Sequence, residues 1–245
     1  MQWYAQLPST NVLAAAFAER GAREGAVVVA ESQTAGRGRL GRTWCSPPGA
    51  GLYVSVLLRP PDAVVPLLTL TAGVALADGV GAATGLTPVL KWPNDLHAWP
   101  PAGGLPIGRK LGGILAEAGT AQGGDRHVVV GFGINVRDAV YPPEVAVRAT
   151  SLEQELGRTV DRALVLAESL AALAARYDDL LAGRAEGVLM AWRAYARPLL
   201  GRPVAWVDGR RKRRGVAENV DADGALRIRT KTEIARVTSG EVEWQ

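Results

Sequence analysis

Arginine and glycine are interleaved between Gly36 and Arg42, in the order Gly-Arg-Gly-Arg-Leu-Gly-Arg. The first six of these residues fit the G-x-G-x-x-G pattern of dinucleotide-binding loops, but that motif also needs a helix that begins at the glycines. Residues 43–49 contain Pro47 and Pro48 and predict no helix. What remains is a loop of fixed positive charges whose backbone can approach a ligand closely, which suits a phosphate. A solvent-exposed basic loop without a ligand is the alternative.

Two lysines stand inside polar motifs, although only four of the 28 basic residues are lysine. Lys91 begins Lys-Trp-Pro-Asn-Asp, where the proline predicts a strand end and a turn that exposes Asn94 and Asp95. These two side chains suit a magnesium-bound phosphate, and an ordinary turn is the alternative. Lys110 precedes two glycines in an apolar strand, so its ammonium stands beside bare backbone. The alternative there is a surface lysine before a bulged strand.

A fourth segment, 128–136, is an apolar strand pattern that Gly131 and Gly133 interrupt and that ends near the amide of Asn135. Taken by itself, this segment is better explained as a bulged core strand. The four segments therefore become informative only in combination.

The composition restricts which chemistry is available. A single cysteine, Cys45, excludes an internal disulfide, and with only two histidines the usual Cys/His zinc site is not expected, so no metal ligands are predicted. Hydrophobic residues make up 48% and charged residues 21% of the 245, as in ordinary globular proteins. We find no signal-peptide pattern and no apolar run near the ~18 residues of a membrane span, so we expect a cytoplasmic protein.

The apolar periodicity predicts the elements that position these segments. Helices are expected over 11–20, 66–83, 151–154, 161–181 and 190–195, and strands over 26–30, 52–59, 89–92, 111–118 and 128–136. Because helices and strands do not alternate strictly, an α+β fold is favoured over a doubly wound sheet. Beyond a Pro/Gly boundary near Gly201, four short strand patterns with turns at Asp208-Gly209 and Asp223-Gly224 predict a small SH3-like β-barrel.

In their order and wording these segments resemble the biotin protein ligases. The resemblance spans nearly the whole chain and rests on five runs: Ser9 to Asn11, Glu31 to Arg39, Lys91 to Asp95, Lys110 to Leu115 and Gly131 to Asn135. It implies an α+β fold, with a mixed-sheet, biotin- and ATP-binding catalytic domain of the biotin/lipoate ligase type over 1–198 and an SH3-like domain over 199–245. It also implies that the biotin carboxylate attacks the α-phosphorus of MgATP, giving biotinyl-5′-AMP and pyrophosphate. A lysine of a biotin carboxyl carrier protein then attacks the mixed anhydride.

The resemblance also assigns site residues, position by position. Those implied as catalytic are Lys110, Arg39 and Asp95. Those implied to bind biotin are Ser9, Thr10, Asn11, Gln33, Gly36, Arg37, Gly38, Arg39, Lys110, Gly113 and Gly131. Those implied to bind ATP are Arg39, Arg42, Trp44, Lys91, Asn94, Lys110 and Asn135. Magnesium is expected to arrive with ATP.

Some features depart from the family pattern. The matching residues begin almost at the start of the sequence, so we expect no repressor-type helix-turn-helix and no DNA partner. Leu40 stands where a basic residue is often found, which leaves one charge fewer in the loop. Arg148-Ala149-Thr150 stands where some members place an aromatic residue over the adenine, and 97–109 is longer than the expected tight turn.

Two other functions stay open from the sequence. Lipoate ligases share the fold and also adenylate a carboxylate, but the Arg/Gly loop together with the Lys91 motif favours biotin. A non-enzymatic nucleic-acid-binding module would use the basic run 210–214, which has no interleaved aromatic residues for base stacking. A solvated hairpin is the simpler explanation of that run. A homodimer is compatible with the resemblance, and no membrane partner is expected.

Overall fold

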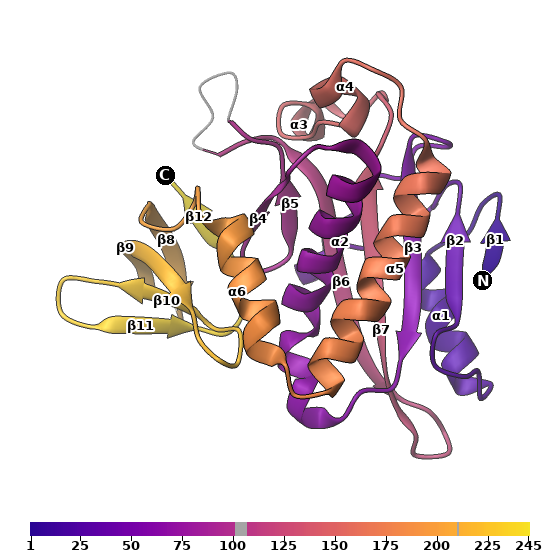
Figure 1. Cartoon of the computed structure of the whole chain (residues 1–245), viewed down its shortest axis with the longest axis horizontal. Coiled ribbons are helices and arrows are strands. Elements are labelled where there is room, and N and C mark those ends of the chain that lie inside the picture. The colour runs from indigo at the N-terminus through magenta and orange to yellow at the C-terminus, as the bar shows by residue number, and fades with distance from the viewer. Residues whose placement is uncertain (101–106, 210) are drawn as a thin grey trace.

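The computed structural model of the chain describes residues 1–100, 107–209 and 211–245. Within these residues, a seven-stranded mixed sheet has the order β1-β2-β3-β7-β6-β5-β4 (Figure 1). Only β1 and β2 pair in parallel among the described neighbours, and the other pairs are antiparallel. The strands are β1 (Gln2–Tyr4), β2 (Val27–Ala30), β3 (Gly51–Leu58), β4 (Val89–Lys91), β5 (Asp95–His97), β6 (Lys110–Thr120) and β7 (Arg126–Asn135). The predicted α+β class is confirmed.

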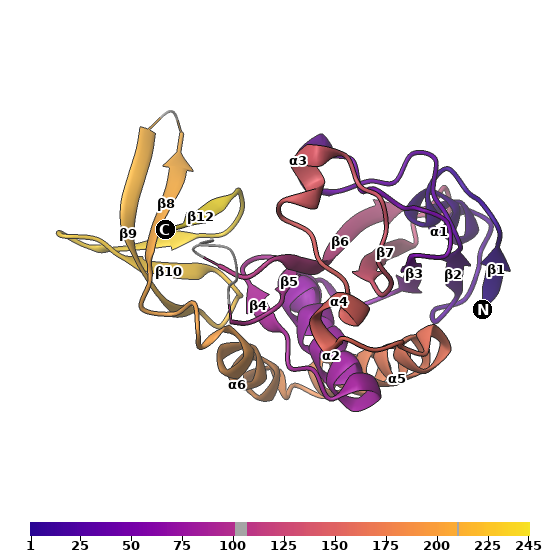
Figure 2. The same ribbon diagram turned by 90° about the horizontal axis from the view of Figure 1, so that it is seen from above.

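Helices cover both faces of this sheet (Figure 2). One face packs against α1 (Thr10–Glu19), and the other packs against α2 (Leu68–Thr84) and α5 (Arg162–Leu181). The helix α6 (Ala185–Ala196) lies beside α2 and leads to the small C-terminal sheet. The remaining helices are short: η1 (Arg39–Gly41), η2 (Asp62–Leu67), α3 (Pro143–Ala146) and α4 (Leu152–Leu156).

Strand periodicity distributes the apolar side chains between the two faces. Val28 and Leu57 pack in the cluster under α1, whereas their neighbours Val29 and Leu58 pack in the main core under α2 and α5. Because both faces are covered, β3 is buried at every position. This explains why its sequence is apolar apart from Ser55 and does not alternate between apolar and polar residues.

The helices α4 and α5 begin at residues whose side chains cap them, whereas α1 does not. Ser151 accepts a hydrogen bond from the Gln154 amide, and Asp161 accepts from two amides of the first turn of α5. Ser9 has the extended backbone of a cap before α1, but its side chain makes no capping bond in the described structure. It lines a cavity instead, so a residue type that favours helix starts serves the site here.

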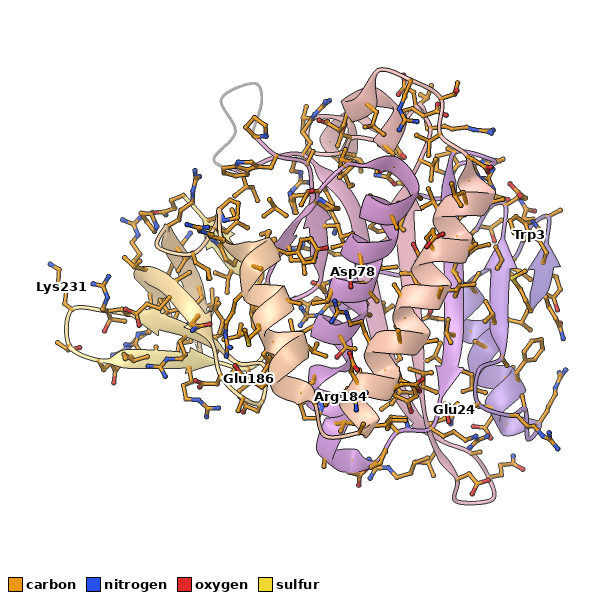
Figure 3. All side chains as sticks on the ribbon, viewed as in Figure 1. Trp3, Glu24, Asp78, Arg184, Glu186 and Lys231 are labelled. Carbon is orange, nitrogen blue, oxygen red and sulfur yellow. The ribbon has the colours of Figure 1, made fainter. Side chains whose placement is uncertain are left out.

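The apolar segment Asp62–Thr84 is long and apolar enough to cross a membrane by length and composition alone, yet 67% of its apolar 18-residue window is buried inside the structure. It is the central core helix. Asp78 of this helix accepts hydrogen bonds from Arg176 of α5 at 2.8 Å and from Tyr195 of α6 at 2.7 Å, so one carboxylate joins three helices (Figure 3).

A second sheet, five-stranded within the described residues, forms the C-terminal part with the antiparallel order β11-β10-β9-β8-β12. Its strands are β8 (Pro203–Asp208), β9 (Arg211–Val220), β10 (Leu226–Arg229), β11 (Ile234–Val237) and β12 (Val242–Trp244). The predicted turn at Asp223-Gly224 is confirmed, with Gly224 at a φ of +82°. The expected small β domain is therefore present.

The basic run at the start of β9 is not a set of free charges. Lys212 pairs with Glu243 at 2.7 Å, and Arg213 pairs with both Asp208 and Glu233. Arg213 also lies over the Trp206 ring at 5.2 Å. Position 210 is outside the described residues. The idea of an unpaired basic patch for nucleic acid loses support, because two of the described cations already face carboxylates.

We expect Gly79→Ala to lower the free energy of unfolding by about 1–3 kcal/mol, the cost of overpacking a core. A Cβ at position 79 of α2 would come within 2.5 Å of the Ser169 backbone in α5, which cannot move independently of its helix. Gly81→Ala in the same helix is the matched control, since its nearest neighbour is 3.8 Å away. The control should be neutral or stabilising by up to about 1 kcal/mol. Urea unfolding compares the two variants, and equal effects would contradict the expected close packing.

Candidate active site

Two adjoining cavities lie beside the glycine-rich part of the seven-stranded sheet. The inner cavity, of about 150 Å³, is lined by Ser9, Thr10, Gln33 and Gly131 among others. The outer cavity, of about 410 Å³, is lined by His97, Asn135, Tyr141 and Trp244 among others. Seven residues line both: Arg42, Thr43, Trp44, Lys91, Asp95, Lys110 and Glu241. The cavities therefore meet at a boundary rich in charged side chains.

The residues predicted from the sequence converge on these cavities, with one exception. All of the implied biotin positions except Gly36 line the inner cavity, and of the implied ATP positions Asn135 lines only the outer one. Gly36 packs beneath the loop, where an added Cβ would lie 2.4 Å from the Trp44 carbonyl and 2.9 Å from the Ser46 hydroxyl. Its contribution to the structure is close packing rather than a cavity wall.

The Arg/Gly loop folds back on itself at the cavity rim. The Gly38 amide donates to the Arg42 carbonyl at 2.7 Å, and the Trp44 amide donates to the Gly36 carbonyl at 2.9 Å. At the tip, Leu40 has a φ of +57°, a left-handed backbone that is uncommon for a residue with a branched side chain. The position that departs from the family pattern is thus also the locally strained one.

Trp44 closes the wall between the two cavities, because β6 and β7 carry glycines beneath its indole. A Cβ at Gly133 would lie 2.4 Å from the ring, and one at Gly113 would lie 3.0 Å from it. The glycines that interrupt these apolar strands therefore make room for an aromatic side chain from the loop. Lys110 Nζ also lies 5.3 Å from the Trp44 ring centroid.

A β-bulge brings Lys110 into the site. In the ladder between β5 and β6, Leu96 pairs with Gly112 but His97 pairs with Lys110, so Leu111 is the extra residue. Because strand side chains alternate, the bulge leaves Leu111 in the core and places Lys110 on the same side as Asp95. Lys110 Nζ then lies 2.6 Å from Asp95 Oδ1.

The charges at the boundary hold one another in place. Burial alone would raise the pKa of Asp95, but His97, Lys110 and Lys91 outweigh it and hold that pKa well below its usual value. His97 Nε2 is 3.9 Å from Asp95 Oδ2, too far for a hydrogen bond, whereas Lys110 Nζ is in direct contact with Asp95 Oδ1 at 2.6 Å. Burial also lowers the pKa of Lys91, against the opposing effect of Asp95. Asp95 thus stays ionised at neutral pH.

Arg39 and Asn94, separated in sequence, are linked across the inner cavity. Arg39 Nη1 donates to Asn94 Oδ1 at 3.2 Å, and Asn94 Nδ2 donates to the Ile114 carbonyl at 2.8 Å. The amide of Asn94 is therefore oriented by the backbone of β6, and it in turn holds the loop arginine. The alternative of an ordinary turn, in which the Asn94 side chain bonds only to its own turn, is therefore not what the structure shows.

Several cavity residues could not be identified from the sequence. Glu241, just before β12, pairs with Arg42 of the loop, and Trp244 of β12 lies beneath Lys91 Nζ at 5.7 Å. These residues come from the C-terminal sheet, and their three-residue strand gives no visible periodicity. The pairing with a loop some 200 residues earlier has no local signal at all.

The outer cavity also contains aromatic and polar side chains that the sequence analysis did not single out. His97 Nδ1 lies 2.5 Å from the Gly108 carbonyl, while its Nε2 has no hydrogen-bond partner among the described residues. Burial raises the pKa of Tyr141 to about 12, so its phenol stays protonated. Arg148 and Ala149 line the outer cavity too, so the position without the expected aromatic residue does face it.

The arrangement suits two substrates whose reacting ends meet at the boundary. The inner cavity offers neutral hydrogen-bonding side chains, the outer cavity offers aromatic rings, and cations lie between them. Fixed cations at such a point stabilise negative charge that develops between two anionic reactants. Over the part of the chain that the structure describes, no group of three or more His, Cys, Asp or Glu could hold a metal ion.

Known proteins are similar to this chain in fold and in sequence. The model of the Biotin/lipoate A/B protein ligase family matches residues 3–135, and that of the Biotin protein ligase C terminal domain matches residues 199–244. The bifunctional ligase/repressor BirA of Bacillus spizizenii is 36% identical over 242 residues, covering 97% of this chain and 71% of that protein. The biotin--[acetyl-CoA-carboxylase] ligase of Mycobacterium tuberculosis is 35% identical, covering 97% and 86%. A solved biotin protein ligase from Aquifex aeolicus in complex with biotin and ATP has a TM-score of 0.83 at 28% identity, covering 100% and 97%.

The depressed pKa of Asp95 leads to a prediction about stability and pH. The folded chain binds the Asp95 proton less readily than the unfolded chain, so the carboxylate's stabilisation is complete above about pH 4 and is lost as the pH falls further. At neutral pH we expect Asp95→Asn to lower the free energy of unfolding by about 1.5–3 kcal/mol, as for a hydrogen bond to a charged group. Urea unfolding from neutral pH down to about pH 3 measures the difference. A gap between parent and variant that does not shrink below about pH 4 would contradict this role.

Proposed function

The chain belongs to the biotin/lipoate A/B protein ligase family, and we propose that it is a biotin protein ligase. It activates biotin with ATP to biotinyl-5′-AMP and transfers the biotin to a lysine of a biotin carboxyl carrier domain. The observation that carries this proposal is the position of Lys110. Its ammonium stands where a polar inner cavity meets an aromatic outer cavity, which is where two anionic reactants must be joined.

The inner cavity is proposed to hold biotin. The fused rings of biotin are neutral and need a few fixed hydrogen bonds in a narrow pocket. Thr10 and Gln33 are oriented for this, since the Thr10 amide donates to Gln33 Oε1 at 2.8 Å and Gln33 Nε2 donates to Ser46 at 2.9 Å. The biotin carboxylate at the end of its chain would then lie at the charged boundary.

The outer cavity is proposed to hold the adenosine part of ATP. Aromatic rings suit a purine, and both Tyr141 and Trp244 line this cavity. Tyr141 and Trp244 are proposed to take the place of the aromatic side chain that is missing at Ala149. Asn135, whose amide donates to the Thr150 carbonyl at 3.0 Å, is held at the same cavity by the chain that precedes α4.

Three residues are proposed to act at the reacting centre. Lys110 and Arg39 offset repulsion between the biotin carboxylate and the α-phosphate and stabilise the charge on phosphorus. Asp95 holds the Lys110 ammonium through their 2.6 Å contact. Magnesium is proposed to enter as MgATP, which is the substrate form. Its charge would assist at the phosphates.

The pairing of Arg42 with Glu241 is proposed to place the loop over the bound substrates, because it links the loop to the C-terminal sheet. The domain boundaries, 1–198 and 199–245, stay predictions. So do a cytoplasmic location, a homodimer and the lack of a DNA or membrane partner. No contact in the described structure favours lipoate over biotin.

Labelled biotin, MgATP and a biotin carboxyl carrier domain are expected to yield a covalently labelled carrier when the protein is present. Omitting ATP should abolish the label, because the carboxylate must be adenylated before an amine can displace AMP. Labelled lipoate is the competing substrate. Transfer of lipoate but not biotin would overturn the proposed substrate, and transfer of neither would overturn the activity.

Lys110→Ala is expected to slow biotin-dependent pyrophosphate release by about 10²–10³-fold, the usual effect of removing one preorganised charge-stabilising group. The fold should survive because the strand glycines are unchanged. Lys231→Ala is the matched control, an exposed lysine in the connection between β10 and β11 (Figure 3). A folded Lys110→Ala protein that releases pyrophosphate at the rate of the control would contradict the proposed role of Lys110.

A further inference from the structure

Glu117 of β6 lies outside both cavities but contacts two residues of the inner one. Its Oε1 is 3.0 Å from Arg37 Nη2 in the loop, and its Oε2 accepts from Asn11 Nδ2 at 2.8 Å. Arg37 and Asn11 both line the inner cavity, whereas Glu117 is not among its lining residues. The implied site residues did not include Glu117.

From Glu117 a chain of hydrogen bonds runs beneath the inner cavity. Asn11 Oδ1 lies 2.6 Å from the Ser55 hydroxyl, and that hydroxyl lies 2.8 Å from Thr10 Oγ1. Ser55 is fully buried on β3 and lines neither cavity. Beyond Thr10 the hydrogen-bond chain continues through Gln33 to Ser46. Ser46 follows the Arg/Gly loop in sequence, so the hydrogen-bond chain has contacts on both sides of that loop.

The direction of each bond in this chain follows from the carboxylate. A carboxylate only accepts, so the amide nitrogen of Asn11 must face Glu117, and its oxygen must face Ser55. Asn11 Nδ2 also lies 3.3 Å from the Leu115 carbonyl, another acceptor, which gives the same amide orientation. The Ser55 proton is then donated to Asn11, and the Ser55 oxygen is left to accept from Thr10.

The consequence reaches the cavity at Thr10. Its hydroxyl has one proton, and the two neighbours within reach, the Ser55 oxygen at 2.8 Å and Gln33 Oε1 at 3.2 Å, are both acceptors. The nearer of the two, the Ser55 oxygen, receives the Thr10 proton, so the Thr10 oxygen keeps free lone pairs and has no proton for a ligand. Thr10 is therefore an acceptor toward the inner cavity.

We propose that Glu117 is a positioning residue that, together with the more distant Leu115 carbonyl, sets the hydrogen-bond direction of the inner cavity, and that it anchors the loop through Arg37. This inference rests on the proposed function, because the ligand it concerns is biotin. The ureido ring of biotin carries two N–H donors, and an enforced acceptor selects a donor at that point. Glu117 would thus contribute to specificity for a ureido N–H without touching the ligand.

The test compares biotin with the two cyclic carbamates in which one ureido N–H is replaced by an oxygen. Binding is measured by calorimetry without ATP, for the parent, Glu117→Ala and Glu117→Gln. We expect both variants to bind biotin about 10- to 100-fold more weakly, as for loss of a charged hydrogen bond. The preference for biotin over one of the carbamates should fall by about tenfold or more. The KM for ATP should stay within about twofold.

Glu218→Gln is the matched control. Glu218 is a carboxylate on β9 of the C-terminal sheet and pairs with Arg229 at 2.5 Å. Its substitution should leave biotin binding and selectivity unchanged. Ser55→Ala breaks the chain at its middle without touching Glu117 and should lose the same selectivity. If one Glu117 variant fails to fold, the other and Ser55→Ala decide.

The outcomes separate this inference from the proposed function. If the parent does not bind biotin, the proposed function fails. If the parent binds biotin and the variants keep its full preference over both carbamates, the role of Glu117 is wrong while the ligase function stands. A uniform loss of affinity for biotin and both carbamates, with a lowered melting temperature, would also overturn it, because that is the result of a structural role alone.

Discussion

The ion pair between Asp95 and Lys110 is the interaction on which the rest of the site depends. Five cationic side chains, those of Arg37, Arg39, Arg42, Lys91 and Lys110, line the inner cavity and repel one another. Asp95 offsets that repulsion at 2.6 Å from Lys110, and the lysines in turn keep the buried carboxylate ionised. Removing either sign leaves an uncompensated charge in a poorly hydrated place, which costs far more than a surface pair would. The site is therefore a balanced set of charges that can accept an anionic reactant.

Geometry puts that balance at the junction of the cavities. The bulge at Leu111 turns Lys110 to the side of Asp95, and the glycines of β6 and β7 admit the Trp44 indole beside it. A regular ladder would send the lysine to the opposite face, where the core is apolar. The irregularities of these strands therefore place a charged side chain and an aromatic ring at the cavity wall of an otherwise apolar sheet.

The C-terminal sheet contributes residues to the walls of both cavities. Trp92 Nε1 donates to the Gly224 carbonyl at 3.0 Å, so the Lys-Trp-Pro-Asn-Asp segment is tied to a hairpin of the small sheet. Glu241 pairs with the loop residue Arg42, and Trp244 lies under Lys91. The cavity residues and the small sheet are therefore held together by direct side-chain contacts.

The sequence by itself determined the helices and strands that are long enough to show a repeating apolar pattern. It also determined which side-chain types are present in the polar motifs. The long helices, the buried strands and the polar motifs were all visible, because periodicity and side-chain type are local properties. The three-residue strands β1, β5 and β12 were not predicted. The ion pairs that Lys212 and Arg213 form with carboxylates were not predicted either. Only the tertiary structure decided which charges are paired, that Glu241 joins the loop and that Glu117 orients Asn11. Those contacts join residues distant in the chain, and their directions depend on registers and bulges that no local pattern records.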